Sequence, residues 1–426
     1  MEHRSREDKI LRVDDKSNEA RYYLSFFLWP FGLMLASFKH WDRPWSKNVF
    51  WLFCIFFGFT FIIAEEGGAD SDRYAQLFLQ YAHSNPSLKE LLNSFYSESS
   101  NYVDIAQPLI TYIVSRLTHN PSILFGIFGL IFGYFYSRNI WLVLNKIKGN
   151  FSTIVILYIV TFILINPIWN INMFRMWTAS QIFIYGTLLY LLEGKKKSLI
   201  WSGVSVLFHF SFLFPCTILF LFILLKNRLN VYLFFFIITS FINELNLQSL
   251  QSSLSFLPAA FQFRVGSYTD IEYAEEISLQ TQSLNWYVPL SSKALTWAAY
   301  IMVLFTYLNY RIILKERRDL MTLLCFSLLL YGFANIFSLV PSGDRFLTVA
   351  NSFMFAFLMI FISDATKTNG LVFAKVLSVP FLLLFCIVAI RVGMDFYGLI
   401  TIFGNPIFAV INTDNVQLIT GVKNLF

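Results

Sequence analysis

Charged residues are scarce in this sequence. Only 14% of its 426 residues are Asp, Glu, Lys or Arg, whereas 56% are hydrophobic and the mean hydropathy is +0.58. A typical soluble domain carries about 25% charged residues, and a water-exposed surface does not accommodate so apolar a composition. The 49 Phe residues suit helices that face lipid and the aromatic belts of a bilayer. Most of the chain is therefore expected to lie in a membrane.

Cysteine is also rare, and the familiar motifs of soluble enzymes are missing. The four cysteines lie inside apolar stretches without C-x-x-C spacing, so we expect neither a disulfide nor a metal site. The sequence has no Walker loop, dinucleotide fingerprint, H-E-x-x-H or nucleophile elbow, which argues against a nucleotide-driven mechanism. The net charge is +6, but the Lys and Arg residues form short clusters between apolar runs. Such clusters mark cytoplasmic loops rather than a nucleic-acid surface.

Long apolar runs recur along the whole chain. A helix needs roughly 20 apolar residues to cross a hydrocarbon layer about 30 Å thick. The runs predict an all-α, polytopic integral membrane protein with about 10 to 12 membrane-spanning helices, in a single domain over residues 22–426. The clearest predicted spans are Asn48–Ala64, Ser122–Trp141, Phe151–Asn170, Met176–Leu192, Val231–Ile242, Ser291–Leu314, Leu320–Val340, Phe346–Ser363 and Leu371–Ile390.

The distribution of Lys and Arg predicts how these spans are oriented, because positive residues near span ends stay in the cytoplasm. With the basic clusters inside, the N-terminal tail of residues 1–21 is cytoplasmic, and the two long outer loops are Glu65–His119 and Leu245–Pro289. Acidic residues concentrate in these outer loops, which agrees with the assignment. The first outer loop contains Leu77–Tyr81 and Leu88–Phe95, spaced like short amphipathic helices on the membrane surface.

Three apolar segments do not fit a single helix that spans the membrane. Leu199–Leu225 has basic clusters at both ends, so about 27 residues must enter and return, which predicts a hairpin of short helices turning near Ser211–Pro215. Tyr22–Ser37 is interrupted by Pro and Gly and fits a re-entrant or interfacial helix. Gly393–Val410 fits either a last span or an outer surface segment.

Three basic side chains are expected where a helix meets the outer face. Arg175 and Arg345 each open a span that runs inwards, and His209 lies near the tip of the predicted hairpin. Charge at membrane depth costs roughly 2.5–3.5 kcal/mol, so such residues usually face a cavity or a partner. Because arginine presents a planar fork that matches phosphate oxygens, the group predicts a phosphate site. The alternatives are arginines that snorkel to the headgroups, an ion pair of Arg345 with Asp344, and a satisfied core histidine.

Two further candidates lie in the outer loops. Asp70 and Asp72 follow an early span, two residues apart. A carboxylate there could act as a general base toward a sugar hydroxyl, bind a cation or orient a sugar, and an ordinary solvated loop is the alternative. Arg264 is the only basic residue deep in the second outer loop, which makes it a candidate contact for a phosphate or a sugar.

Three motifs occur in a distinctive order. They are Gly68-Ala-Asp70-Ser-Asp72-Arg73-Tyr74, then Phe174-Arg175 leading a helix that ends Tyr190-Leu-Leu-Glu-Gly194-Lys195, and then Leu207-Phe208-His209-Phe-Ser211. In these motifs, and in Arg345 near a late span, the chain resembles the EpsG family of Wzy-type polysaccharide polymerases from bacterial surface-glycan operons. One departure is Asp104-Ile-Ala-Gln-Pro108, which stands where a Glu-Pro-Gly-Phe-like segment is expected and leaves the role of Asp104 open.

The resemblance implies a GT-C-like glycosyltransferase of the bacterial inner membrane with its active site facing the periplasm. Undecaprenyl-diphosphate-linked glycans would be donor and acceptor, as in O-antigen, capsule or exopolysaccharide synthesis. No cofactor, nucleotide sugar or metal is implied, and a chain-length regulator and a flippase are candidate partners. A lipid-linked oligosaccharide flippase, a glycan ligase and an inactive membrane scaffold remain as alternatives.

The resemblance also assigns roles to the candidate residues. Arg175, Arg345 and Arg264 would bind the diphosphate and neutralise its developing charge. Asp70 or Asp72 would accept the proton of the acceptor hydroxyl. The remaining candidate, His209, would donate a hydrogen bond or orient an arginine.

Overall fold

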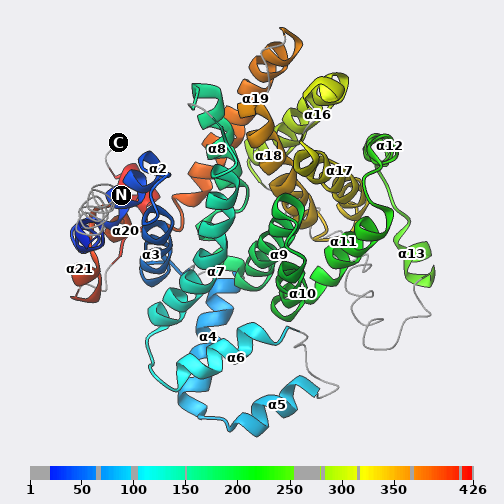
Figure 1. Cartoon of the computed structure of the whole chain (residues 1–426). Helices are drawn as coiled ribbons and strands as arrows, with labels where there is room; N and C mark the ends of the chain where they lie inside the picture. Colours follow the sequence, from blue (N-terminus) through cyan, green and yellow to red (C-terminus); the bar gives the residue numbers. More distant parts are fainter. Residues whose placement is uncertain are drawn as a thin grey trace, which may run out of the picture.

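The computed structural model describes residues 20–63, 69–96, 104–148, 151–253, 279, 284–313, 317–364, 369–411 and 415–424. This part of the chain is built from helices and turns, and contains no β-strand (Figure 1). The membrane-type helices are α3 (Ser46–Phe59), α7 (Pro121–Leu144), α8 (Thr153–Ile165), α9 (Phe174–Glu193), α12 (Leu229–Thr239), α16 (Tyr287–Ile313), α17 (Arg318–Phe337), α18 (Arg345–Asp364) and α19 (Asn369–Gly393).

Six helical segments of the described chain are long and apolar enough to cross a membrane. One of them, Thr153–Glu193, comprises α8 and α9 joined by the 3₁₀-helix η1 (Ile168–Met173). Shorter apolar segments accompany the six, among them α3 and α12. Each of the clearest predicted spans corresponds to one of the helices above, with ends that differ by a few residues. The predicted all-α polytopic fold is confirmed.

Helix α9 is at the centre of the bundle. It packs against α7, α17, α18 and α10 (Leu199–Phe208), and its side chains are mostly buried. Pro167 follows Asn166 at the end of α8, which ends that helix because a residue before proline is disfavoured in helical conformation. The chain then turns through η1 and enters α9. At the other end Gly194 takes a left-handed conformation, with φ of 66°, and closes α9.

The predicted hairpin of short helices is present. Helix α10 (Leu199–Phe208) is followed by the single turn η3 (Phe210–Phe212) and by α11 (Leu213–Leu225). His209 separates α10 from η3 because its backbone is extended, with φ of −150° and ψ of 117°. The turn thus falls within a few residues of the predicted position.

The first predicted outer loop is a helical layer over its described residues. It contains α4 (Asp70–Ser84), α5 (Leu88–Tyr96) and α6 (Ala106–Ser115), which lie across one end of the bundle below α7, α9 and α10 (Figure 1). The expected helix Leu77–Tyr81 is therefore the C-terminal part of a longer one. Asp70 and Asp72 in the first turn of α4 favour this earlier start, because carboxylates there interact well with the helix dipole. In the second outer loop, α13 (Leu247–Ser253) is described and the segment around Arg264 lies outside the described residues.

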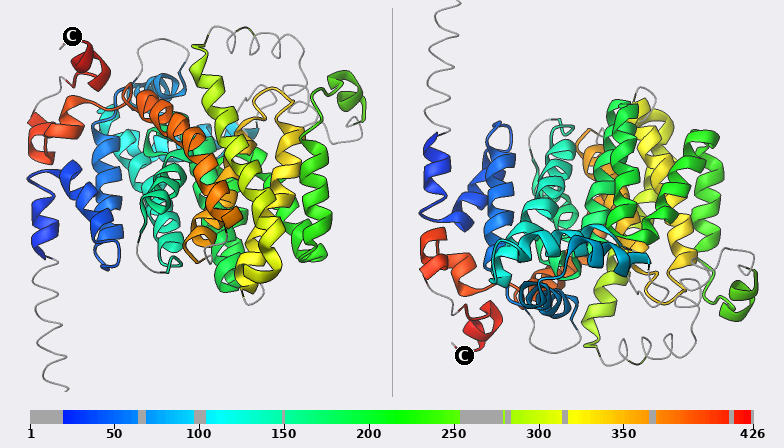
Figure 2. Two further views of the ribbon diagram at one scale, coloured as in Figure 1. Left: turned by 90° about the horizontal axis from the view of Figure 1, so that it is seen from above. Right: turned by 90° about the horizontal axis from the view of Figure 1, so that it is seen from below.

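The two end segments of the chain lie side by side at one edge of the bundle (Figure 2). α2 (Pro30–Lys39) covers only half a crossing, and the Trp29 indole that precedes it donates to the carbonyl of Ile402 at 2.6 Å. Gly393–Val410 is not one continuous span, because it is divided into α20 (Leu399–Phe403) and α21 (Pro406–Ile411).

Candidate functional site

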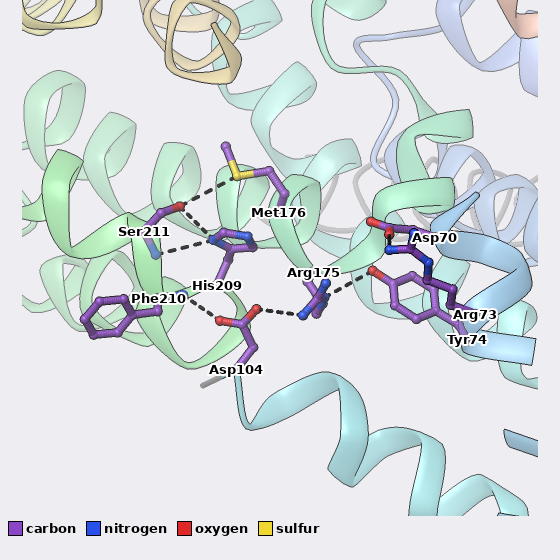
Figure 3. Close-up of polar contacts among 9 residues, drawn as sticks. All are labelled: Asp70, Arg73, Tyr74, Asp104, Arg175, Met176, His209, Phe210 and Ser211. Carbon is purple, nitrogen blue, oxygen red and sulfur yellow. Dashed lines mark hydrogen bonds and ion pairs between the residues drawn. The ribbon is translucent and has the colours of Figure 1, made fainter. Parts of the chain in front are cut away.

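The candidate site is at the beginning of α9, where the chain enters the bundle directly after η1. Phe174 opens the helix, is fully buried and stacks on Phe128 of α7 with ring centroids 3.9 Å apart. Successive side chains of an α-helix are rotated by about 100°, so the anchored Phe174 ring fixes the direction of Arg175. Arg175 points between α4 and the residues that precede α6 (Figure 3).

The Arg175 guanidinium has two partners from the segment that contains α4 and α6. Its Nε donates to the Tyr74 hydroxyl of α4 at 3.3 Å, and its Nη1 donates to Asp104 Oδ2 at 3.3 Å. These contacts leave Nη2 without a partner among the described residues. About a third of the side chain (33%) stays exposed, so the guanidinium can still bind an external anion.

Tyr74 is a buried, neutral partner for this arginine. Its side chain is 5% exposed, and it packs edge-on against Phe128 at 5.8 Å. Burial raises the pKa of the Tyr74 hydroxyl to about 12, although the positive charge of Arg175 opposes the rise. The hydroxyl is thus protonated at neutral pH, so it orients Arg175 without cancelling its charge.

Asp104 connects Arg175 with the turn that carries His209. The carboxylate is only 6% exposed; while Oδ2 accepts from Arg175, Oδ1 accepts from the backbone N–H of Phe210 at 2.8 Å. Ile105 N–H also donates to the carbonyl of Leu207 at 3.2 Å, which attaches the start of α6 to the end of α10. A buried carboxylate is stable when its oxygens accept hydrogen bonds in this way.

The His209 ring caps the η3 turn through its Nδ1 atom. Nδ1 lies 2.7 Å from the Ser211 hydroxyl oxygen and 3.3 Å from the Ser211 backbone nitrogen. A backbone N–H can only donate, so these contacts assign Nδ1 as an acceptor and place the proton of the neutral ring on Nε2. The Ser211 hydroxyl is also 3.9 Å from the sulfur of Met176, the residue after Arg175. His209 and Arg175 are therefore held in one connected arrangement.

The two carboxylates of the Asp70-Ser-Asp72 motif have different surroundings. Residues four apart share a helix face, so Asp70 faces the same way as Tyr74, whereas Asp72 is turned by about 200° from Asp70. Asp70 acts electrostatically on both Tyr74 and Arg175 and pairs with Arg73 at 3.6 Å. Asp72 accepts from Gln76 at 2.8 Å on the exposed face of α4. Asp70 lies with Tyr74 beside Arg175 (Figure 3), and the group of Asp70, Tyr74, Asp104, Arg175 and His209 is called the Arg175 cluster below.

The other two predicted arginines are Arg345 and Arg264. Arg345 opens α18, and the ring of the next residue, Phe346, packs against Phe214 at 5.0 Å and Phe212 at 6.4 Å. The start of α18 is thus beside the η3 turn, but within the described residues no contact joins Arg345 to Arg175. Arg264 lies outside the described residues.

Sequence reasoning missed two residues of this cluster. Tyr74 is the last residue of the motif that begins at Gly68, but no role was predicted for it. The role of Asp104 was left open. A lone acidic residue between apolar neighbours and before an apolar helix is the signal that points to Asp104. Tyr74 had no comparable signal, because the expected helix began at Leu77, and only the observed start of α4 at Asp70 places the two residues four apart on one helix.

The cluster has the parts of an anion-binding site with a nearby base. It offers an arginine with an exposed donor, an imidazole N–H and, next to Arg175, a carboxylate that could accept a proton. Among the described residues, no group of three or more His, Cys, Asp or Glu side chains is placed to share a metal ion.

Comparison with known proteins gave one match. No curated protein and no solved structure matches the chain, so the GT-C-like relationship stays a prediction. The model of the EpsG family matches residues 49–401, which is most of the chain and includes every residue of the cluster. The chain belongs to the EpsG family, as its sequence motifs predicted.

Proposed function

We propose that this protein is a polysaccharide polymerase that joins undecaprenyl-diphosphate-linked repeat units at the outer, periplasmic face of the bacterial inner membrane. Membership of the EpsG family supports a polymerase-type role in general. The observation that carries the finer proposal is Arg175, a partly exposed guanidinium held at a helix end by Tyr74 and Asp104. Such a group suits an anionic leaving group that arrives with a membrane lipid.

In the proposed reaction the growing lipid-linked glycan is the donor and a newly delivered repeat unit is the acceptor. The acceptor hydroxyl oxygen forms a bond to the anomeric carbon, and the bond from that carbon to the diphosphate oxygen breaks. The diphosphate leaves with the electron pair, and the hydroxyl proton passes to a carboxylate. Negative charge therefore grows on the leaving diphosphate while a proton is removed on the acceptor side.

Each part of the cluster has a role in this step. Arg175 neutralises the diphosphate through its exposed donors, and the Nε2–H of His209 donates to a phosphate oxygen. Asp70, rather than Asp72, is the base, because it is on the face of α4 that meets Arg175. Asp104 and Tyr74 keep the guanidinium in place before the substrate arrives, which is the preorganisation that lowers charged barriers. Arg345 and Arg264 are proposed as further contacts to the diphosphate.

The test uses purified protein with a synthetic lipid-diphosphate repeat unit and a gel that resolves glycan length. Wild-type protein should produce a ladder of multiples, and Arg175→Ala should slow its formation about 100-fold or more, as for loss of other preorganised donors. Arg391→Ala is the matched control, because Arg391, near the end of α19, has a similarly exposed side chain (39%) and also pairs with a carboxylate, that of Asp395 at 2.9 Å, but has no proposed role in the reaction. A normal ladder from Arg175→Ala would contradict the assignment of the diphosphate site.

The same experiment separates the alternative functions. A ligase would transfer the glycan to another acceptor without lengthening the repeat-unit lipid, so no ladder would form. A flippase would leave the lipid chemically unchanged and would instead move it across the bilayer of sealed vesicles. Either outcome with a competent substrate would reject the polymerase.

A further inference from the structure

A cluster of buried polar side chains lies deeper in the bundle than the candidate site. It consists of Asn139 on α7, Asn166 at the end of α8 and Gln181 on α9, six residues beyond Arg175. Their exposed fractions are 2%, 2% and 3%. Amides that are buried in a membrane-type bundle need partners, because an unpaired polar group in an apolar environment costs several kcal/mol.

Backbone carbonyls fix the orientation of two of these amides. Gln181 Nε2 donates to the carbonyl oxygen of Asn166 at 3.0 Å, and a carbonyl can only accept. The Gln181 Oε1 atom must then face Asn139, whose Nδ2 donates to it at 2.7 Å and to the Gln181 carbonyl at 2.9 Å. Both N–H groups of the Asn139 amide are used, and its Oδ1 points elsewhere.

Two complementary atoms are left over. Asn170 donates to Asn166 Oδ1 at 2.9 Å, so the Asn166 Nδ2 group points away from Asn170. Asn139 Oδ1, an acceptor, and Asn166 Nδ2, a donor, are both buried without a hydrogen-bond partner in the described part of the chain. A ligand that satisfies both must donate one hydrogen bond and accept another.

The space beside them has the size of one water molecule. Asn139, Asn166 and Gln181 line a cavity of about 10 Å³ together with Tyr136 and Ser352. About 10–15 Å³ is the volume that one water needs. Tyr136 donates to the carbonyl of Ile163 at 2.8 Å and Ser352 donates to that of Thr348 at 3.0 Å, so each hydroxyl oxygen can still accept.

We propose that this cavity binds one water molecule that bridges α7 and the end of α8. The water donates to Asn139 Oδ1, accepts from Asn166 Nδ2 and donates to a hydroxyl, which gives the roughly three hydrogen bonds of a typical buried water. A cation would not fit, because the Asn166 Nδ2 group presents hydrogen atoms to the site. Since Asn166 caps α8 just before η1, the water helps to hold the segment that leads to Arg175.

Hydroxyl-radical footprinting with short X-ray pulses tests the proposal on wild-type protein in lipid nanodiscs. Radicals form from water and react within a few bonds' length of their origin, so a buried side chain is labelled fast only beside a bound water. Phe162 of α8 lines the cavity, and Tyr158, one turn earlier on the same helix, is fully buried away from it. Phe162 should be modified several-fold faster than Tyr158.

The outcomes decide the matter in either direction. Equal rates at the two aromatic residues, whether both slow or both fast, would overturn the proposal. Asn139→Leu, which removes the acceptor at similar volume, should lower the rate at Phe162 to that at Tyr158. Unchanged fast labelling of Phe162 in that variant would also overturn it. If the variant does not fold, the wild-type comparison alone decides.

Discussion

Asp70 and Asp72 are neighbours in the sequence but have different surroundings on α4. Asp70 is one helical turn before Tyr74 and lies on the side of α4 that faces Arg175. Asp72 instead accepts a hydrogen bond from Gln76 on the exposed side. If Asp70 is the base, Asp70→Asn should slow polymerisation about 100-fold or more, since general-base catalysis contributes about 10²–10⁴. Asp72→Asn is the matched control and should keep near-normal rates. The ladder assay measures both, and an equal loss in the two variants would refute the distinction.

The His209 ring offers a second prediction at the residue scale. Its Nδ1 accepts from Ser211, so the ring N–H that can donate is on Nε2, and the proposed mechanism uses this donor. Glutamine places its amide nitrogen near the position of Nε2, and asparagine places its own nearer to Nδ1. His209→Gln should therefore retain more activity than His209→Asn in the same ladder assay, and the opposite order would contradict the Nε2 assignment.

Helices α3 and α7 approach each other closely at glycine residues. At Gly129 an added Cβ would collide with the Cys54 carbonyl of α3, and at Gly58 with the Phe125 carbonyl of α7. Such small residues let backbones approach closely, which drives helix association in membranes. Gly203 on α10, by contrast, has no atom within 4 Å of an added Cβ.

Gly129 and Gly203 give a matched pair of predictions about the stability of the protein. Gly129→Ala should destabilise the protein by about 1–3 kcal/mol through overpacking. Gly203→Ala should be neutral or stabilising by up to about 1 kcal/mol, because Ala has the higher helix propensity. Thermal unfolding in detergent compares the two, and a Gly129→Ala variant as stable as wild type would show that α3 and α7 can separate at little cost.

At the scale of the whole molecule, the distribution of Lys and Arg predicts which end of the bundle faces the cytoplasm. The α4–α6 layer and the start of α9 are then outside, and the turn between α9 and α10 is inside. Lys89 of α5 and Lys196 of that turn are both exposed and can carry single cysteines. Lys89→Cys should react with an impermeant maleimide in right-side-out vesicles and Lys196→Cys in inverted ones.

The native cysteines give little background in this labelling. Cys54, Cys325 and Cys386 are buried and Cys216 is half-buried, so unmodified protein supplies the blank. The reverse labelling pattern would place the candidate site in the cytoplasm and exclude the proposed polymerase topology.

Apolar runs and basic clusters were enough to predict the helices and the hairpin. Burial of apolar side chains in lipid requires long helices, so length and hydropathy identify them locally. The motif around Arg175 and His209 likewise pointed to one region of the chain and to the EpsG family.

Only the tertiary structure decided which polar groups meet. Asp104 contacts Arg175 and the Phe210 backbone across separations of 71 and 106 residues, and such pairings leave no periodic trace in a sequence. Asp70 and Asp72 point to different sides of α4. This difference could be assigned only once the start of that helix was known. The sequence by itself determined the helical membrane fold, because that depends on local hydropathy. The arrangement of the site depends on helix packing, which brings distant residues together and was visible only in the assembled bundle.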